Sequence, residues 1–490
     1  MTKRATAIAR GVVIQVAARV TGLPLSLVSL IIATRYLGLH GYAVLTTAVV
    51  FVGLFDTFTD LGVGTVIVRR VAGRENASLA RLVGMNLTFS LCYALPLLLV
   101  AVIAGFFAYP GQSTAQVAVL IVSSGLLFDT LSSCLDPVFD VHVRYTAVAA
   151  AEFCSRVVTL AASLLVVFAD AGLLAMCAVQ VLPQLIRMIT LAVAARRIIT
   201  LRLVRAKAET VRLLKESVPF ALIMLIAIVY WRVDGVLLSL LSSSTQVAAY
   251  GIALQLAFNL AVIPQVFSRS AMSTINASYA TDPERFRGAV DSGYRFLLLC
   301  SVPIGVLGIP LAGRILTLVA NQFTEPATGT LQLFFVACAL SFITTIVSNA
   351  LIAAHEQRFL TRLSAINLVL NIGLNLVFIP LFGAVGTGIA LVITELSGVV
   401  FTQSRMRRAG AEKLPVGYAL RLIPGLVAAL AAMWLTWRLP FVVPLSAGGL
   451  AYLGGAWLGG ALPAPMRSTI LGALHLRTAR SAEHPANVAS

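Results

Sequence analysis

Charged side chains are scarce in this sequence. Only 11% of its 490 residues are Asp, Glu, Lys or Arg, whereas 59% are hydrophobic. In a soluble globular domain about a quarter of the residues are charged. The scarcity therefore excludes an ordinary soluble fold, and most of the surface is expected to face lipid.

Acidic residues are the rarer of the two charged classes. The sequence has 19 Asp and Glu against 36 Lys and Arg, a formal net charge of +17. A basic excess can indicate nucleic-acid binding. Here, however, the basic residues lie in short segments between apolar runs, such as 69–81, 196–216 and 405–417. Because this pattern orients membrane proteins, we expect no nucleic-acid partner. We predict a multi-pass protein of the cell inner (plasma) membrane with both termini in the cytoplasm.

Metal-binding and disulfide patterns are also missing. The six cysteines lie in apolar stretches without CxxC spacing, and the histidines lack the spacing of metal ligands. The segments on the predicted outer side are short, and the longest is near 319–328. These absences predict no disulfide, no metal, no cofactor and no catalytic residues, so the sequence does not indicate an enzyme.

Long apolar runs dominate what is present. A helix needs about 20 mostly apolar residues to cross a bilayer, and about fourteen such runs predict an all-α polytopic membrane protein. The runs lie near 11–34, 42–67, 82–108, 115–134, 146–168, 172–195, 218–241, 246–274, 295–318, 329–353, 363–382, 384–404, 418–438 and 441–461. The first run is too long for the core of a cleaved signal peptide, so we expect it to be retained.

The basic segment after the sixth run divides the chain into two halves. Gly41-Tyr42 and Tyr250-Gly251 begin the second and eighth runs, and this correspondence suggests two parallel repeats. We predict an amino-terminal lobe of six spans (1–200), a basic cytoplasmic linker (201–216) and a second lobe of six spans (217–408). Two further spans (409–461) and a cytoplasmic tail (462–490) follow.

Three segments resemble one family of membrane transporters. They are Arg35 to Tyr42 (RYLGLHGY) with DLGVG at 60–64, Trp231 to Asp234 (WRVD) with AYG at 249–251, and Asn371 to Asn375 (NIGLN) with IPLFGAVGTG at 379–388. Together they resemble the Wzx-type lipid-linked oligosaccharide (polysaccharide) flippases. This group belongs to the multidrug/oligosaccharidyl-lipid/polysaccharide exporter (MOP) superfamily.

The resemblance implies a V-shaped transporter of two six-helix lobes around a cationic cavity, with two carboxy-terminal helices added. The implied substrate is a polyprenyl-pyrophosphate-linked oligosaccharide, moved from the cytoplasmic to the outer leaflet for cell-surface polysaccharide synthesis. Alternating access and ion coupling are the implied mechanism. Membrane lipid and a polysaccharide polymerase or glycosyltransferases are the implied partners.

Arginines within the predicted spans are the candidate substrate-binding residues. A charge at the centre of a membrane helix costs about 3 kcal/mol or more, so it usually faces an aqueous cavity or a partner. Arg19, Arg232 and Arg269 lie in spans one, seven and eight, which the resemblance places around the cavity. Since a guanidinium offers a planar fork to phosphate, we predict that they bind the pyrophosphate. Snorkelling or a structural ion pair is the alternative.

Four carboxylates are candidates for ion coupling. Asp56 and Asp60 are four residues apart and are expected on one face of span two. Asp234 and Glu395 are lone carboxylates in spans seven and twelve. Each could carry a coupling proton, although Asp56 and Asp60 could equally pair with an arginine. Arg156 is four residues after Glu152, and these two are expected to pair along their own helix.

Two other transport functions fit the same resemblance. A lipid II flippase would differ only in its substrate. A multidrug cation antiporter should have an acidic or aromatic cavity, whereas the charge within the spans of this chain leans basic. A membrane-embedded glycosyltransferase or polymerase would need a sizeable outer loop or a carboxylate cluster at a membrane face, and the sequence indicates neither.

Overall fold

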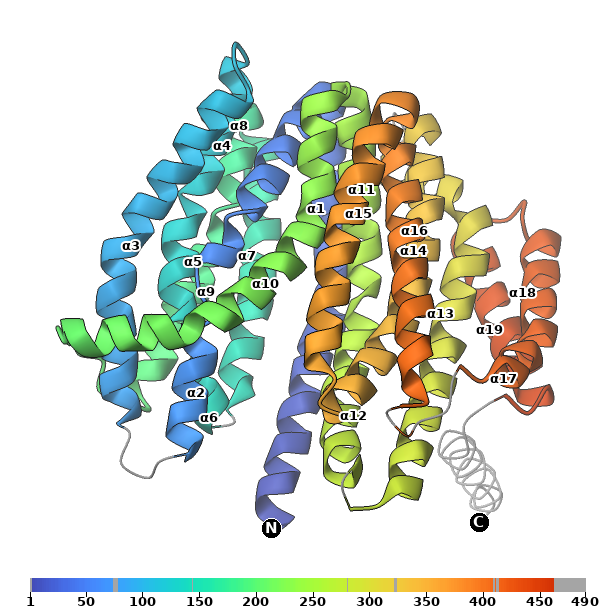
Figure 1. The fold of residues 1–490 in the computed structure, drawn as a ribbon. Helices are drawn as coiled ribbons and strands as arrows, with labels where there is room; N and C mark the ends of the chain where they lie inside the picture. Colours follow the sequence, from blue (N-terminus) through green and yellow to red (C-terminus); the bar gives the residue numbers. More distant parts are fainter. Residues whose placement is uncertain are drawn as a thin grey trace, which may run out of the picture. The chain divides into compact units, whose positions relative to one another are not determined.

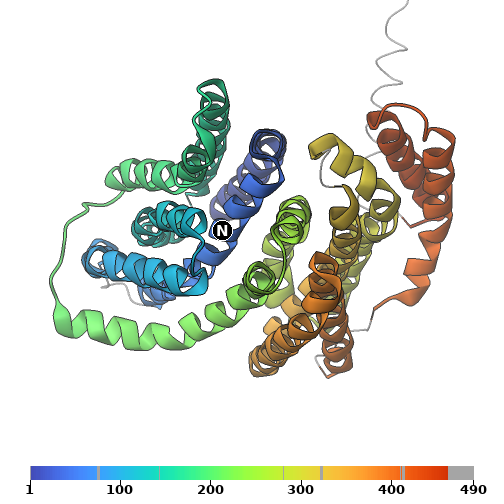
Figure 2. The ribbon, with the colours of Figure 1, turned by 90° about the horizontal axis from the view of Figure 1, so that it is seen from above.

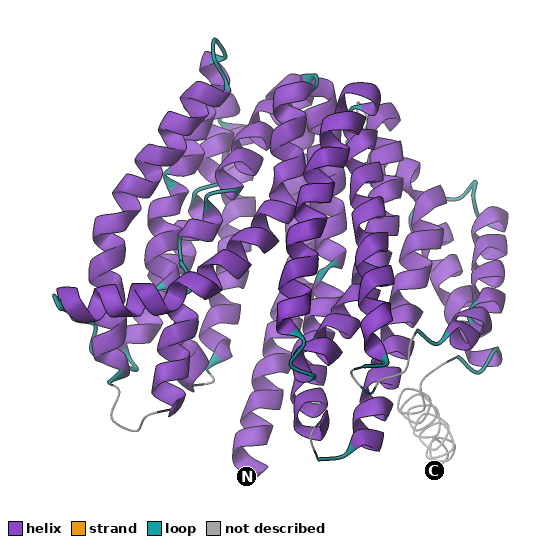
Figure 3. Cartoon of the chain, in the orientation of Figure 1, coloured by secondary structure: helices purple, strands orange, loops and turns teal. Residues whose placement is uncertain are grey.

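The computed structural model describes residues 2–73, 78–142, 144–279, 281–320, 324–408, 410 and 414–461. The side chains of 2–20, 72–73, 145, 223, 227, 258, 269–270, 273–274 and 324–326 lie outside this description. Helices and short connections make up the described part, and no strand occurs in it (Figure 3). The predicted all-α fold is therefore confirmed.

The helices follow the apolar runs of the sequence. In the first part of the chain they are α1 (Thr2–Gly53), η1 (Asp56–Phe58), α2 (Val63–Gly73), α3 (Leu79–Ala108), α4 (Ser113–Ser123), α5 (Gly125–Ser133), α6 (Asp136–His142), α7 (Tyr145–Phe168), α8 (Gly172–Val179) and α9 (Leu182–Arg196). The later helices are α10 (Lys207–Leu241), α11 (Ser244–Leu260), α12 (Val262–Tyr279), α13 (Pro283–Val319), α14 (Thr324–Ala353), α15 (Gln357–Phe382), α16 (Ala384–Met406), α17 (Val416–Arg421), α18 (Ile423–Leu435) and α19 (Val442–Leu458).

Gly38 separates the first two predicted spans within α1. Its backbone has φ 62° and ψ −170°, a conformation that glycine adopts without the steric cost other residues would bear. Figure 1 shows the chain rising from the amino terminus to this region and then reversing its direction. The two arms of α1 correspond to the predicted spans near 11–34 and 42–67.

Helix length and composition make the chain a multi-pass membrane protein. Among the described residues, eleven helical stretches are long and apolar enough to cross a membrane, and a twelfth is a bent pair within α10. One stretch, Thr21–Val71, contains parts of both of the first two predicted spans, and the last predicted span coincides with the shorter apolar helix Val442–Leu458. Large apolar side chains such as Phe107, Val369 and Leu450 are more than half exposed, as lipid-facing residues should be. The count of fourteen spans stays a prediction.

Two predicted boundaries need correction. Span two is not one continuous helix, because α1 ends at Gly53 and α2 begins at Val63. The intervening turn contains Leu61 and Gly62 with φ of 50° and 70°. The basic linker is not a loop throughout, because α10 already begins at Lys207. Residues 207–216 are rich in Ala, Leu, Lys, Arg and Glu, which are strong helix formers.

The residues form two compact units by their internal contacts. Unit 1 comprises Met1–Ser270, Ala312–Ala337 and Gln357–Gly398, and unit 2 comprises Ala271–Leu311, Cys338–Glu356 and Val399–Ser490. The predicted division into lobes at 1–200 and 217–408 stays a prediction. In unit 2, the hydroxyl of Tyr452 on α19 donates to the carbonyl of Leu299 on α13 at 2.9 Å. Gln403 on α16 donates to the hydroxyl of Tyr294, also on α13, at 2.8 Å. These bonds tie α19 and α16 to one helix.

Candidate functional site

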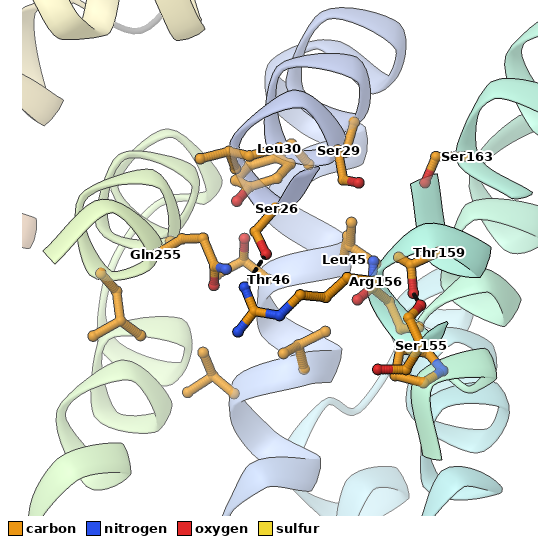
Figure 4. A pocket seen from close by; sticks show the side chains of 18 of the residues that line it. Ser26, Ser29, Leu30, Leu45, Thr46, Ser155, Arg156, Thr159, Ser163 and Gln255 are labelled. Atoms are coloured by element: carbon orange, nitrogen blue, oxygen red, sulfur yellow. Dashed lines mark hydrogen bonds between the residues drawn. The ribbon is translucent and has the colours of Figure 1, made fainter. Parts of the chain in front are cut away.

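A cavity of about 240 Å³, lined by both polar and apolar side chains, lies inside unit 1. Its walls come from both arms of α1, from α7, from the turn between α8 and α9, and from α10 and α11. Figure 4 shows side chains from three directions converging on it. The lining includes two arginines, Arg156 and Arg232, and no carboxylate among the residues that the structure describes. The cavity therefore carries positive charge.

Arg156 reaches from α7 across to the first arm of α1 (Figure 4). Its Nη1 donates to the carbonyl of Gly22 at 3.0 Å and to Ser26 Oγ at 2.7 Å. Gly22 makes room for the arginine, since a Cβ there would lie 2.6 Å from Arg156 Cδ. These contacts orient the guanidinium at the cavity wall. Sequence reasoning missed this role, and the expected pair with Glu152 stays a prediction.

Arg232, one of the three predicted arginines, also lines the cavity. It lies on the later part of α10 and packs against the end of α1, where a Cβ on Gly53 would be 3.2 Å from Arg232 Cζ. Asp56, just beyond Gly53, is close enough for its charge to interact with that of Arg232. The other two predicted arginines, Arg19 and Arg269, have side chains outside the described residues.

Hydroxyl groups accompany the two arginines. Ser155, Thr159 and Ser163 follow one another at intervals of four residues on α7, and all three line the cavity. Ser26 and Ser29 face it from α1. Because residues four apart share one face of a helix, this stripe of small polar residues in an apolar span was a signal that sequence reasoning could have used to find Arg156.

Asp56 and Asp60 do not lie on one helical face, which corrects the prediction. Asp56 begins the short helix η1, and its carbonyl accepts from Thr59 Oγ1 at 2.7 Å. Asp60 follows in the turn, and its Oδ1 accepts from the backbone N–H of Gly64 at 3.1 Å. Asp60 thus satisfies a free N–H in the first turn of α2, in the manner of a helix cap.

Arg187 connects two aspartates close to this turn. Its Nη1 is 3.3 Å from Asp129 Oδ1, and its Nη2 is 2.8 Å from Asp136 Oδ2. Asp129 also accepts from Thr59 Oγ1 at 3.4 Å. The network joins α9, α5, the start of α6 and the turn before α2. Sequence reasoning could not pair these residues, because they lie more than 50 positions apart along the chain.

Asp234 and Glu395, the two remaining coupling candidates, are both buried and each accepts from a tyrosine. Asp234 is 3% exposed, and its Oδ1 accepts from the Tyr250 hydroxyl and from the Gly235 N–H, each at 2.9 Å. Glu395 is 5% exposed, and its Oε1 accepts from the Tyr230 hydroxyl at 3.0 Å. Tyr230 and Asp234 lie one helical turn apart on α10, so this helix contacts both carboxylate sites.

The fold has clear relatives among solved structures. A lipid II flippase, MurJ, in its inward closed conformation matches with a TM-score of 0.76 at 15% identity, over 91% of this chain and 98% of that one. An inward-facing multidrug resistance MATE family transporter of the MOP superfamily matches with a TM-score of 0.67 at 13% identity, over 81% and 98%. At such identities the likeness shows the fold alone, and that fold is the one of MOP-superfamily transporters.

The amino-acid sequence shows the family itself. Residues 8–275 match the model of the polysaccharide biosynthesis protein family, and residues 219–377 match the MatE model. The chain belongs to the polysaccharide biosynthesis protein family. It is also 25% identical over 190 residues to the probable flippase AglR of Haloferax volcanii, an alignment that spans 38% of this chain and 40% of that relative. The predicted membership of the MOP superfamily is thus confirmed.

Proposed function

We propose that this protein is a flippase for polyprenyl-pyrophosphate-linked oligosaccharides, which it moves from the cytoplasmic to the outer leaflet for cell-surface polysaccharide synthesis. The observation that carries the proposal is the pair Arg156 and Arg232 on the wall of one cavity among membrane-spanning helices. Charged residues are costly at this depth, and their presence favours a function in binding an anion. The family and the flippase named among its relatives support the same activity.

The cavity chemistry fits the pyrophosphate part of such a substrate. Arg156 is oriented by α1, and a guanidinium binds phosphate oxygens through charge-assisted, geometrically defined hydrogen bonds. The neighbouring hydroxyls can donate to further oxygens of the phosphates or the first sugar. A volume of about 240 Å³ is below the range typical of drug-sized ligands, so this conformation suits the anionic linkage and not a whole oligosaccharide.

Alternating access is the proposed mechanism, with the polyprenyl chain remaining in lipid. An inside-negative membrane potential favours outward movement of an anion by about 2.3 kcal/mol per charge per 100 mV.

Asp56, Asp60, Asp234 and Glu395 remain the coupling candidates. Asp234 and Glu395 fit this role better, because each is buried beside a tyrosine hydroxyl that could exchange a hydrogen bond as the carboxylate changes its protonation. Arg19 and Arg269 remain candidates for binding the pyrophosphate.

A multidrug cation antiporter is the less favoured alternative. Two arginines lie on the cavity wall and no carboxylate is among the described lining residues, a lining that suits an anion better than a cationic drug. A lipid II flippase would use the same pyrophosphate contacts, so transport assays with the two lipids must separate these substrates.

We place the protein in the inner membrane with cytoplasmic termini, and a polysaccharide polymerase or glycosyltransferases are its candidate partners.

The test is lipid flipping by the purified full-length protein in liposomes, with a polyprenyl-pyrophosphate oligosaccharide in one arm and lipid II in another. We expect Arg156→Gln and Arg232→Gln to reduce flipping about tenfold or more, because each removes a charge-assisted contact. Arg144→Gln is the matched control, since Arg144 is exposed and does not line the cavity. Wild-type rates in both cavity variants would contradict the proposal. If the protein flips lipid II faster than the polyprenyl-pyrophosphate oligosaccharide, its substrate is lipid II and not the proposed one.

A further inference from the structure

The helix α10 consists of two parts with different directions. Lys207–Ile226 and Ile228–Leu241 are bent by 45° relative to each other. Figure 1 shows the first part lying crosswise to α3, and Figure 2 shows it along the edge of unit 1, reached by the connection from α9. Because α3 is one of the helices long and apolar enough to cross a membrane, a part that lies crosswise to it is expected to run along the bilayer and not across it.

One face of this crosswise part is fixed to the rest of unit 1. Leu213 is 1% exposed and belongs to the apolar core between α2, α3 and α9. Glu216 Oε1 is 2.8 Å from Arg70 Nη2 on α2, and Glu209 Oε1 is 2.8 Å from Arg81 Nη2 on α3. These contacts define which side chains point away from the protein.

The contacts with α3 place this part near the boundary of the hydrocarbon. The N–H of Val204 donates to the carbonyl of Gly84 at 3.3 Å and to Thr88 Oγ1 at 3.0 Å. α3 has 30 residues and is about 45 Å long, whereas the hydrocarbon core is about 30 Å thick. With α3 upright and centred in the bilayer, about 7 Å remains at each end, and Gly84 lies about 7 Å from the start of α3. The segment before α10 thus contacts α3 at the depth where headgroups meet hydrocarbon.

The outer face of the crosswise part combines apolar and basic side chains. Val211, Val218 and Leu222 are 43%, 52% and 54% exposed and share one face by their spacing. Lys215 lies within the same face, and Lys207 lies beside it, both exposed. Exposed apolar residues flanked by lysines are typical of helices that lie in the membrane interface.

The net positive charge of the segment around this face favours binding to an anionic surface. The segment 196–216 contains seven Lys and Arg and two acidic residues, so its net charge is 7 − 2 = +5. Both acidic residues, Glu209 and Glu216, are held by arginines of α2 and α3. They therefore do little to neutralise the basic side chains of the outer face.

We infer that residues 196–222 form a binding surface for the headgroups of anionic phospholipids. The lysines and arginines contact the lipid phosphates, while Val211, Val218 and Leu222 enter the apolar edge of the leaflet. The surface anchors the connection between α9 and the spanning part of α10 to the leaflet on the basic side of the protein.

The first experiment measures lipid preference with the full-length protein in nanodiscs of phosphatidylglycerol and phosphatidylcholine. We expect the triple variant Lys207→Gln, Arg212→Gln, Lys215→Gln to lower the enrichment of phosphatidylglycerol around the protein about tenfold or more, since each basic residue near an anionic surface contributes about fivefold. The control Arg358→Gln, Arg407→Gln, Arg408→Gln removes the same charge from exposed residues outside 196–222, of which Arg358 belongs to unit 1 and the other two to unit 2. Equal effects of both triple variants, or no effect of either, would overturn the inference.

A second measurement tests the depth of the outer face. The exposed cysteines, Cys92 and Cys154, are first replaced by Ala, and a fluorophore is attached to Val218→Cys or, as the control, to Thr281→Cys in an exposed turn. We expect a lipid-borne quencher to act more strongly at position 218, and aqueous iodide more strongly at 281. If iodide quenches both positions equally, the face lies in water and the inference fails.

Discussion

Arg156 and Arg187 illustrate, at the scale of the residue, how distant partners determine what a buried charge does. Arg156 is oriented by Gly22 and Ser26 from α1, and it lines the cavity. Arg187 is bound by Asp129 and Asp136, and it does not line the cavity. Both are arginines in apolar spans, and although the hydroxyl stripe beside Arg156 is a local signal, only the structure shows which groups each guanidinium contacts.

The Arg187–Asp136 pair should contribute to stability. Both side chains are about one-third exposed, so the coupling is expected to be below that of a fully buried pair, at about 1–2 kcal/mol. The measurement is a double-mutant cycle with Arg187→Gln and Asp136→Asn, followed by thermal unfolding in detergent. The losses of stability of the two single variants should sum to about 1–2 kcal/mol more than the loss of the double variant, because each single variant already removes the whole interaction. Strictly additive effects would show that the pair contributes nothing.

The break between α1 and α2 shows, at the scale of the element, how an irregular turn is stabilised. A membrane helix that ends within the protein leaves backbone N–H groups without partners, which is costly away from water. Asp60 accepts from Gly64, and Thr59 connects the turn to Asp129. A carboxylate predicted as a coupling group therefore also has a local structural role.

Asp60→Ala should destabilise the protein, and Asp60→Asn should not. Alanine removes the acceptor for the Gly64 N–H, and losing a side-chain cap costs about 1 kcal/mol. Asparagine keeps an oxygen at the same position but cannot titrate, and so it serves as the control. The two variants are compared by thermal unfolding. A loss of stability in Asp60→Asn equal to that in Asp60→Ala would show that the charge, and not the hydrogen bond, matters.

Charge asymmetry determines, at the scale of the whole molecule, which end of each helix lies inside. The basic segments 69–81, 196–216 and 405–417 are all expected on the cytoplasmic side. The connection between α3 and α4, which contains Gln112, is expected outside. This orientation can be tested without knowledge of the substrate.

In intact cells, a membrane-impermeant maleimide should label Gln112→Cys and not Thr281→Cys, since the two exposed positions are expected on opposite sides. Both variants carry Ala at positions 92 and 154, so that the exposed native cysteines do not react. Permeabilised cells provide the control, and both positions should react there. Labelling of Thr281→Cys in intact cells would reverse the proposed topology.

Predictions from the sequence succeeded where the physical signal is local. Apolar runs of sufficient length predicted the all-α membrane fold, and the motifs around Asp60, Trp231 and Asn371 predicted the superfamily. Arg232 lines the cavity, and its predicted role in binding the pyrophosphate stays a prediction. The broken second span was missed, because an apolar run does not reveal a turn whose polar groups are satisfied by distant residues.

The amino-acid sequence by itself determined the solvent of this protein, because a chain so poor in charge can expose its side chains only to lipid. It also determined the helical class, since only internal hydrogen bonding satisfies the backbone in such a solvent. Only the tertiary structure decided that Arg156 lines the cavity, that Arg187 joins two aspartates and that α10 begins crosswise to α3. The physical reason is that each of these depends on groups far apart in the sequence, and their distances are determined by packing.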